Sequence, residues 1–246
     1  MSVSSYSVTD IGRQRQMNQD YVFTSEVPVG VLPNLFMVAD GMGGYKAGEF
    51  ASKSTIDTIV SEVMLSSERK PIKLLKEAIS VANKKIRQKS VTDDNYKGMG
   101  TTLVLSYFDG KSLCVANVGD SRLYLISNEM KQITTDHSLV EEMIRMGGLD
   151  RSKARLHPDK NIITRAVGVV DKVDIDFFEV DDINDGDIIL MCSDGLTNMV
   201  EDEVIESIIL GEGDLKYKAN KLVETANNNG GRDNIAVILV QLFLSE

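Results

Sequence analysis

Five aspartates stand where apolar runs of the sequence end or begin, which makes them the first candidates for chemistry. Asp40 follows the run LFMVA, Asp194 follows IILMC with one serine between, and Asp233 precedes the closing run IAVILV. Asp20 and Asp120 end or occupy the short polar segments NQD and GDSR. Side chains at strand ends are held by a rigid scaffold and face a cleft, so such carboxylates are well placed to bind a metal ion.

The chemistry that these carboxylates favour is the binding of a hard divalent cation. Mg²⁺ and Mn²⁺ take carboxylate, carbonyl and water oxygens and need neither histidine nor cysteine. The chain has only two histidines and two cysteines, which disfavours a zinc site. A single Asp-Gly pair is usually only a turn. Two such pairs, Asp40-Gly41 and Asp194-Gly195, close buried apolar runs and are better explained by a shared site, where glycine lets the backbone approach an ion.

A cysteine-based phosphatase is excluded by the spacing of the sequence. Such an enzyme needs an arginine six places after its nucleophile, but Cys114 is followed there by Asp120 and Cys192 by Asn198. Both cysteines lie inside apolar runs and are interpreted as buried, reduced thiols.

The apolar patterns place the aspartates on short strands. Residues 35–39 and 188–192 are continuous apolar runs typical of buried strands, and 234–243 forms a last strand. Residues 101–133 predict a meander with turns at Asp109-Gly110 and Gly119-Asp120. Helices are expected over 46–65, from Pro71 onward, and over 138–146, 201–209 and 214–228. Hairpin-linked strands with helix pairs between them favour antiparallel sheets covered by helices.

The bulk composition predicts one large domain, 1–246, without linker or repeat. Of the 246 residues 42% are hydrophobic, enough for a sizeable core. The longest strongly apolar run, 235–240, is far too short to cross a bilayer, and no secretion signal opens the chain, so we expect a soluble, cytoplasmic protein. A net charge of −10 argues against nucleic acid and acidic membrane surfaces as partners.

Six short motifs, in order along the chain, resemble the metal-dependent protein phosphatases, the type 2C serine/threonine phosphatases of the PPM family. They are DIGRQRQMNQD at 10–20, DGMGG at 40–44, GMGTT at 98–102, VGDSR at 118–122, SDGL at 193–196 and RDN at 232–234. Each motif alone is weak evidence, but six in the family order are specific. The form DGMGG is that of bacterial relatives. The resemblance implies an α+β fold, a four-layer α-β-β-α sandwich in which two central antiparallel sheets are flanked by helices.

The resemblance also implies a role for each residue of the site. Two Mn²⁺ or Mg²⁺ ions, and a weaker third, would be held by Asp20, Asp40, the Gly41 carbonyl, Asp120, Asp194 and Asp233. Asp40 would bridge the first two ions, and Asp120 would share the third with Asp194. The hydroxide that such ions would supply would attack the phosphorus, so no protein nucleophile would be needed. Arg15 would bind the phosphate through its planar fork of donors; the alternative is a surface salt bridge.

One departure from the family leaves the proton donor for the leaving group open: Met42 stands where some eukaryotic members carry a histidine proposed as that acid. A second departure is Gln19, which stands where many relatives have glutamate, so that Asp20 or water must supply more of the contacts around the nearby ion. We hypothesise that His157 donates the proton or orders a water that does, with a metal-bound water as the competing donor. His137, at the start of an expected helix, is interpreted as structural.

Residues 145–165 form the most basic stretch of the chain, with six lysines or arginines against two aspartates. In the family this part is a flap beside the metals, and its charge can steer phosphoproteins toward an acidic site; the alternative is a solvated loop. The sequence therefore predicts a monomeric phosphatase of phosphoserine and phosphothreonine that opposes a bacterial serine/threonine kinase and acts on its substrates and on the kinase itself. A metabolite phosphatase and a binding module without turnover are the alternatives.

Overall fold

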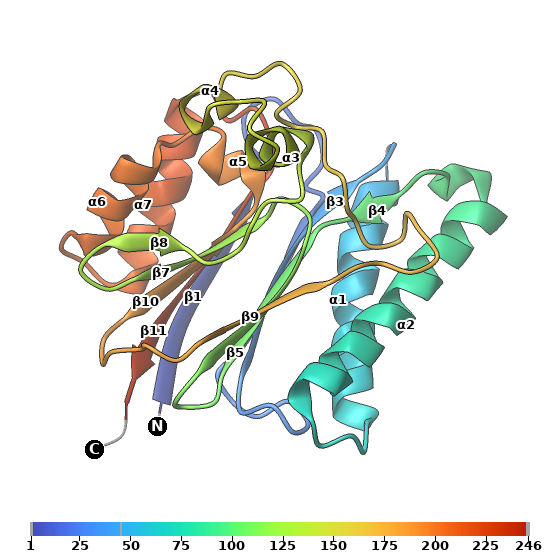
Figure 1. Ribbon diagram of the computed structural model, residues 1–246, viewed down its shortest axis with the longest axis horizontal. Coiled ribbons are helices and arrows are strands. Elements are labelled where there is room, and N and C mark those ends of the chain that lie inside the picture. The colour runs from blue at the N-terminus through green and yellow to red at the C-terminus, as the bar shows by residue number, and fades with distance from the viewer. Residues whose placement is uncertain (1, 45, 245–246) are drawn as a thin grey trace.

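The protein consists of two antiparallel sheets packed face to face, with helices on the outer side of each (Figure 1). The computed structural model describes residues 2–44 and 46–244; the other four residues of the predicted domain 1–246 lie outside the described part. The four layers confirm the predicted α+β fold class. Among the described residues, no helix combines the length and the apolar character that a membrane span requires.

The first sheet is built around the last strand of the chain. Its order is β1-β11-β10-β7-β8. The bounds are β1 Ser2–Asp10, β11 Ile235–Phe243, β10 Ile188–Cys192, β7 Arg122–Ile126 and β8 Met130–Gln132. Strand β1 pairs with β11 along its whole length. It was not predicted, because its sequence SVSSYSVTD is mostly polar, as expected of a strand at a sheet edge.

The second sheet has the order β2-β3-β5-β6-β9, with β4 paired to the end of β3. The bounds are β2 Asp20–Ser25, β3 Leu35–Met42, β4 Gly100–Thr101, β5 Leu103–Phe108, β6 Leu113–Val118 and β9 Asp176–Val180. The hairpin predicted at Asp109-Gly110 joins β5 to β6 and is confirmed.

The second predicted turn, at Gly119-Asp120, is not a hairpin. Strand β6 pairs with β5 and β9, whereas β7 pairs with β10 and β8 of the other sheet. The chain therefore crosses from one sheet to the other at this point. A Gly-Asp turn suits both a hairpin and a crossing between sheets, so only the pairing of the strands distinguishes the two connections.

The helices cover the outer faces of the sheets where the sequence predicted them. Helices α1 (Ala47–Leu65) and α2 (Pro71–Thr92) pack on the second sheet, and α6 (Asp202–Leu210) and α7 (Leu215–Asn228) on the first (Figure 1). A short 3-10 helix, η1 (Asp94–Tyr96), follows α2, and helix α3 (Leu139–Arg145) begins the connection that leads to β9. Two single-turn helices, α4 (Arg151–Ala154) and α5 (Asp194–Thr197), were not predicted.

The core between the sheets holds both of them rigid. It contains fully buried side chains of both inner faces, among them Phe36, Val38, Leu123, Ile189 and Ile238. At about 25 cal/mol per Å² of apolar surface, such burial is the main stabilising contribution to the fold. The ends of β2, β3, β10 and β11 are thereby fixed relative to one another, which is what a site formed at those ends requires.

Candidate metal centre

The five predicted aspartates meet at one end of the two sheets. Asp20 begins β2 and lies directly opposite Asp40 of β3 in the strand register. Asp194 is the first residue of α5, Asp233 precedes β11, and Asp120 lies in the crossing between β6 and β7. All five are close enough to interact, since the charges of the other four raise the pKa of Asp40.

The motif GMGTT positions Asp40 through its two threonines. The Asp40 N–H donates to Thr102 Oγ1 at 2.9 Å, and the Asp40 carbonyl accepts from Thr102 N (2.9 Å) and Thr101 Oγ1 (2.8 Å). Thr102 Oγ1 also lies 2.7 Å from the hydroxyl of Ser121, the residue after Asp120. The threonines thus tie the strand end that carries Asp40 to the crossing that carries Asp120.

Ser193 binds Asp20 directly, and Asn234 ties the segment before Asp20 to the segment of Asp233; sequence reasoning assigned neither residue a role. Ser193 Oγ donates to Asp20 Oδ2 at 2.6 Å and accepts from the N–H of Ala236 at 2.9 Å. Asn234 Oδ1 accepts from the N–H of Gln19, and its Nδ2 donates to the carbonyls of residues 11 and 17. The only signal in the sequence was their place beside Asp194 and Asp233 in the motifs SDGL and RDN.

Glycine is required at two positions where backbones touch. A Cβ on Gly195 would lie 1.9 Å from the carbonyl oxygen of Asn234, and a Cβ on Gly41 would lie 2.1 Å from the carbonyl oxygen of Gly48. These contacts are far shorter than van der Waals separation, so any side chain would push the segments apart. The approach at Gly195 brings the start of α5, with Asp194, against the segment of Asp233.

Burial and mutual repulsion raise the pKa values of these acids. Burial, followed by the charges of the other four acids, raises the pKa of Asp40 well above its usual range. Burial and the charges of Asp194 and Asp233 raise the pKa of Asp20 to about 7, although a hydrogen bond from Ser193 opposes this. Burial and Asp233 raise the pKa of Asp194 to about 6. The centre thus gathers more negative charge than its protein surroundings neutralise.

Arg15 provides a cation at the edge of the centre. Its NH2 group lies 2.7 Å from Asp233 Oδ2, and the side chain is 51% exposed. The hydrogen bond that Arg15 donates to Asp233 raises the pKa of Arg15, and the charges of Asp40 and Asp194 act in the same direction. Arg15 therefore lies at the edge of the acidic centre in a salt bridge with Asp233, and its binding of phosphate stays a prediction.

The two histidines lie in different surroundings. His137 is buried; its Nδ1 accepts from the N–H of Gly119 at 3.0 Å, and its Nε2 lies 2.9 Å from Asp176 Oδ2. It holds the crossing that carries Asp120. His157 lies in the segment 145–165, where its Nδ1 accepts from the N–H of Asp159 at 3.2 Å. Within the described residues it makes no hydrogen bond to the five aspartates, so its role as proton donor stays a prediction.

Divalent cations fit this set of donors. Asp20 Oδ1 is buried and, among the residues that the structure describes, has no hydrogen-bond donor. An unpaired buried carboxylate oxygen is costly unless a cation or a proton offsets it. The available donors are carboxylate and carbonyl oxygens, which suit Mg²⁺ and Mn²⁺. In the described part of the chain, no group of three or more acidic, histidine or cysteine side chains has the spacing of a complete coordination shell.

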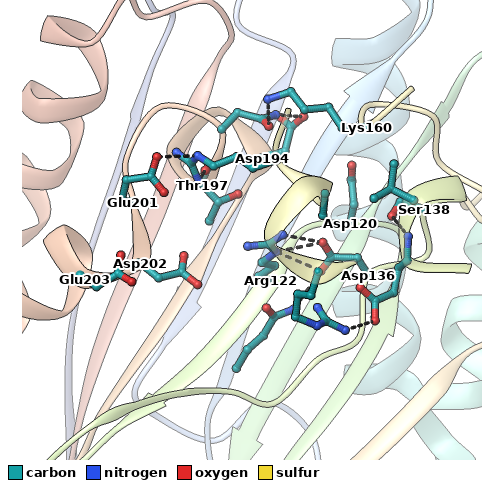
Figure 2. A pocket seen from close by; sticks show the side chains of 17 residues that line it. Asp120, Arg122, Asp136, Ser138, Lys160, Asp194, Thr197, Glu201, Asp202 and Glu203 are labelled. Carbon is teal, nitrogen blue, oxygen red and sulfur yellow. Dashed lines mark hydrogen bonds and ion pairs between the residues drawn. The ribbon is translucent and has the colours of Figure 1, made fainter. Parts of the chain in front are cut away.

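A pocket of about 260 Å³ opens beside the acidic centre, under the segment 145–165 (Figure 2). Asp120 and Asp194 line it on the side of the centre. Arg122 also lines the pocket and donates to Asp136, another lining residue, from Nε (3.0 Å) and NH2 (2.7 Å). Lys160 reaches into the pocket from the segment 145–165 (Figure 2). The pocket therefore lies between the acidic centre and the segment 145–165.

Comparison with known proteins assigns the family. Residues 15–235 match the family model described as Protein phosphatase 2C. The serine/threonine phosphatase stp of Listeria monocytogenes is 40% identical over 248 residues, covering 97% of this chain and 95% of the relative. Protein phosphatase PhpP of Streptococcus pneumoniae is 39% identical over 241 residues, covering 96% of each.

Solved structures of relatives share the whole fold. The serine/threonine phosphatase of S. agalactiae superposes with a TM-score of 0.90 at 37% identity, covering 99% of this chain and all of that one. The catalytic domain of the phosphatase PstP, solved with two manganese ions, superposes with a TM-score of 0.84 at 29% identity, covering 98% and 99% of the two chains. The fold and the acidic centre define a metal-dependent protein phosphatase. The chain belongs to the protein phosphatase 2C family, as its motifs predicted.

Proposed function

We propose that this protein hydrolyses phosphoserine and phosphothreonine in other proteins, with two Mn²⁺ or Mg²⁺ ions in the acidic centre. The observation that carries the proposal is the convergence of five aspartates from both sheets beside one exposed arginine, Arg15. Residues 1–246 would act as one phosphatase domain, with 145–165 as its flap.

Each acid of the centre has a place in the proposed binding of the ions. Asp40 would contact both ions, because it lies opposite Asp20 in the strand register and the charges of Asp20 and Asp194 both raise its pKa. Asp194 and Asp233 would hold one ion, the Gly41 carbonyl would complete the shell of the other, and Asp20 would lie beside them. Asp120 and Asp194, which line the same pocket, would hold a weaker third ion. When bound, such ions supply hydroxide near neutral pH and offset the charge of the phosphoryl oxygens.

Arg15 would bind and orient the phosphate. A guanidinium has five N–H donors in a planar fork, and Asp233 Oδ2 accepts a hydrogen bond from one NH2 group of Arg15 at 2.7 Å. This contact fixes the plane of the fork while leaving donors for two phosphate oxygens, the arrangement in which arginine binds phosphate most strongly. Asp233 would therefore serve both an ion and the orientation of Arg15.

His157 would supply the proton to the departing serine or threonine oxygen. Only the protonated ring can give up a proton and return to a neutral imidazole; Nε2 would be the donating nitrogen, because Nδ1 faces Asp159. Met42 occupies the position of the histidine in some eukaryotic relatives, and its methyl group packs against Gly100. Met42 has no proton to give, which leaves His157 or a bound water as donor.

Proteins phosphorylated by a serine/threonine kinase, and the kinase itself, are the proposed substrates. The support is the name of the relatives, serine/threonine phosphatase, together with a basic flap above an acidic centre. We infer a cytoplasmic monomer, which fits the two buried free cysteines. The binding-module alternative is disfavoured because all five aspartates are present and brought together.

Phosphate release from a phosphothreonine peptide tests the proposal directly. The reaction would be run with Mn²⁺, with Mg²⁺ and with excess EDTA, and a sugar phosphate would serve as the competing substrate. We expect turnover of the peptide with either ion and none with EDTA. The variant Asp40→Asn tests the proposed metal ligand and should lower kcat by several orders of magnitude. Full turnover in EDTA would refute the two-metal proposal, and preference for the sugar phosphate would favour the metabolite phosphatase.

A further inference from the structure

Asn198 links the metal centre to the flap, residues 145–165, through two hydrogen bonds of its side chain. Its Nδ2 donates to Asp194 Oδ2 at 2.8 Å, and its Oδ1 accepts from Lys160 Nζ at 2.8 Å. A carboxylate can only accept and an ammonium can only donate, so the two partners fix which end of the amide faces which. Figure 2 shows Lys160 and Asp194 close together at one side of the pocket.

The backbone around Asn198 is held independently of this side chain. The N–H of Asn198 donates to the Asp194 carbonyl at 2.7 Å, and Gly195 packs directly on the backbone of Asn234. These contacts hold the main chain of α5 in place. The Asn198 side-chain amide in addition fixes the orientation of the Asp194 carboxylate. Since Asn198 is the fourth residue after Asp194, both side chains lie on the same side of this helical turn.

The flap reaches the end of α5 at two points, and only one of them leads to the metal centre. Arg155 binds the Thr197 carbonyl at 2.7 Å and Glu201 at 2.8 Å, contacts that anchor the flap to the backbone and to α6. Lys160 instead donates to the Asn198 amide; burial and the charge of Arg155 lower the pKa of Lys160, and the charge of Asp194 opposes this.

We propose that Asn198 is a positioning residue that couples the flap to metal binding. Lys160 of the flap orients the Asn198 amide, and the amide holds the Asp194 carboxylate in one orientation. This inference rests on the proposed role of Asp194 as a metal ligand. Coupling between two binding events is reciprocal. If closure of the flap on Asn198 strengthens ion binding, then ion binding strengthens closure of the flap by the same factor.

The first test measures Mn²⁺ affinity of the metal-depleted full-length protein by calorimetry. Asn198→Ala should lower the affinity for the tighter-bound ions by about 10- to 100-fold, which is the usual effect of removing a residue that orients a metal ligand. Lys160→Met should also lower this affinity. The double variant should have the same affinity as Asn198→Ala, because both substitutions act through one path. Two control variants should stay within about twofold, since removal of a group outside the coupled path leaves metal affinity alone: Asn229→Ala, whose amide binds the Met199 carbonyl, and Lys153→Met, an exposed lysine of the flap.

The second test follows the flap itself and needs no substrate. Leu156 is 88% exposed, so chymotrypsin can cut the flap beside it. We expect Mn²⁺ to slow this cleavage in the native protein and in Lys153→Met, but not in Asn198→Ala or Lys160→Met. The proposal is overturned if Asn198→Ala keeps native Mn²⁺ affinity, or if Lys160→Met behaves as Lys153→Met in both tests. Should Asn198→Ala not fold, Lys160→Met alone decides, because it changes only a flap side chain. Failure of the proposed function would look different, as a native protein that binds Mn²⁺ without releasing phosphate.

Discussion

Neutralising Asp20 should stabilise the protein in the absence of metal, although it removes a proposed metal ligand. Burial and the charges of Asp194 and Asp233 raise the pKa of Asp20 to about 7, from an ordinary value of 3.8. An acid whose pKa is raised by folding destabilises the folded state at a pH above its ordinary pKa, and this penalty is complete above the raised pKa. In the variant Asp20→Asn the amide can still accept from Ser193, and it replaces the unpaired Oδ1 by a donor next to Asp40.

The size of the effect follows from the two pKa values. At about 1.4 kcal/mol for each pH unit between them, Asp20→Asn should gain about 4 kcal/mol of unfolding free energy at pH 8. At pH 5.5 the folded protein already holds the proton while the unfolded chain is still ionised, so the gain should fall to about 2 kcal/mol. For a chain of this length a gain of about 4 kcal/mol corresponds to roughly 8–16 °C in Tm.

Urea unfolding in EDTA, followed by circular dichroism at pH 8 and pH 5.5, measures both gains. Asp57→Asn, an exposed acid of α1, is the matched control and should change stability by less than about 0.5 kcal/mol. With Mn²⁺ at a hundred times its Kd the native protein should gain about 2.7 kcal/mol, and Asp20→Asn should gain less. The reasoning fails if the variant is no more stable than the native protein at pH 8, or if its gain is equal at the two pH values.

Three further predictions concern individual residues of the site. Arg15→Ala should raise KM and lower kcat, with a loss on the order of 100-fold in kcat/KM, because the phosphate is held in both the ground and the transition state; a change in stability alone would make Arg15 a surface salt bridge. Asp120→Ala should slow turnover while two ions remain in crystals grown with Mn²⁺, and a single remaining ion would contradict a separate third site. His157→Ala should lower kcat far more on a phosphothreonine peptide than on a nitrophenyl phosphate, since the phenolate leaves without a proton; equal losses on both substrates would show that His157 only binds.

The identities of the acids and the family followed from the sequence because both depend on local information. Asp40 and Asp194 close continuous apolar runs, and each is followed by a glycine, so strand end and turn are visible in a few consecutive residues. Helices α1, α6 and α7 were predicted to within a residue or so at each end, since helical periodicity and capping are also local.

The pairing of the strands was decided only by the tertiary structure. The turn at Gly119-Asp120 has the composition of a hairpin, yet it carries the chain between sheets. The polar strand β1 forms only because β11 offers it a partner along its whole length. Strand order depends on which apolar faces meet in the core, and no short window of sequence contains that information.

The contacts that complete the site were likewise beyond the reach of the sequence. Ser193 binds Asp20 across 173 residues of chain, and Arg15 binds Asp233 across 218. The two hydrogen bonds that join Lys160, Asn198 and Asp194 depend on how the flap packs against α5. A sequence shows which side chains can donate or accept a hydrogen bond. Which of them meet is set by the packing of the two sheets, because that packing brings distant strand ends within 3 Å of one another.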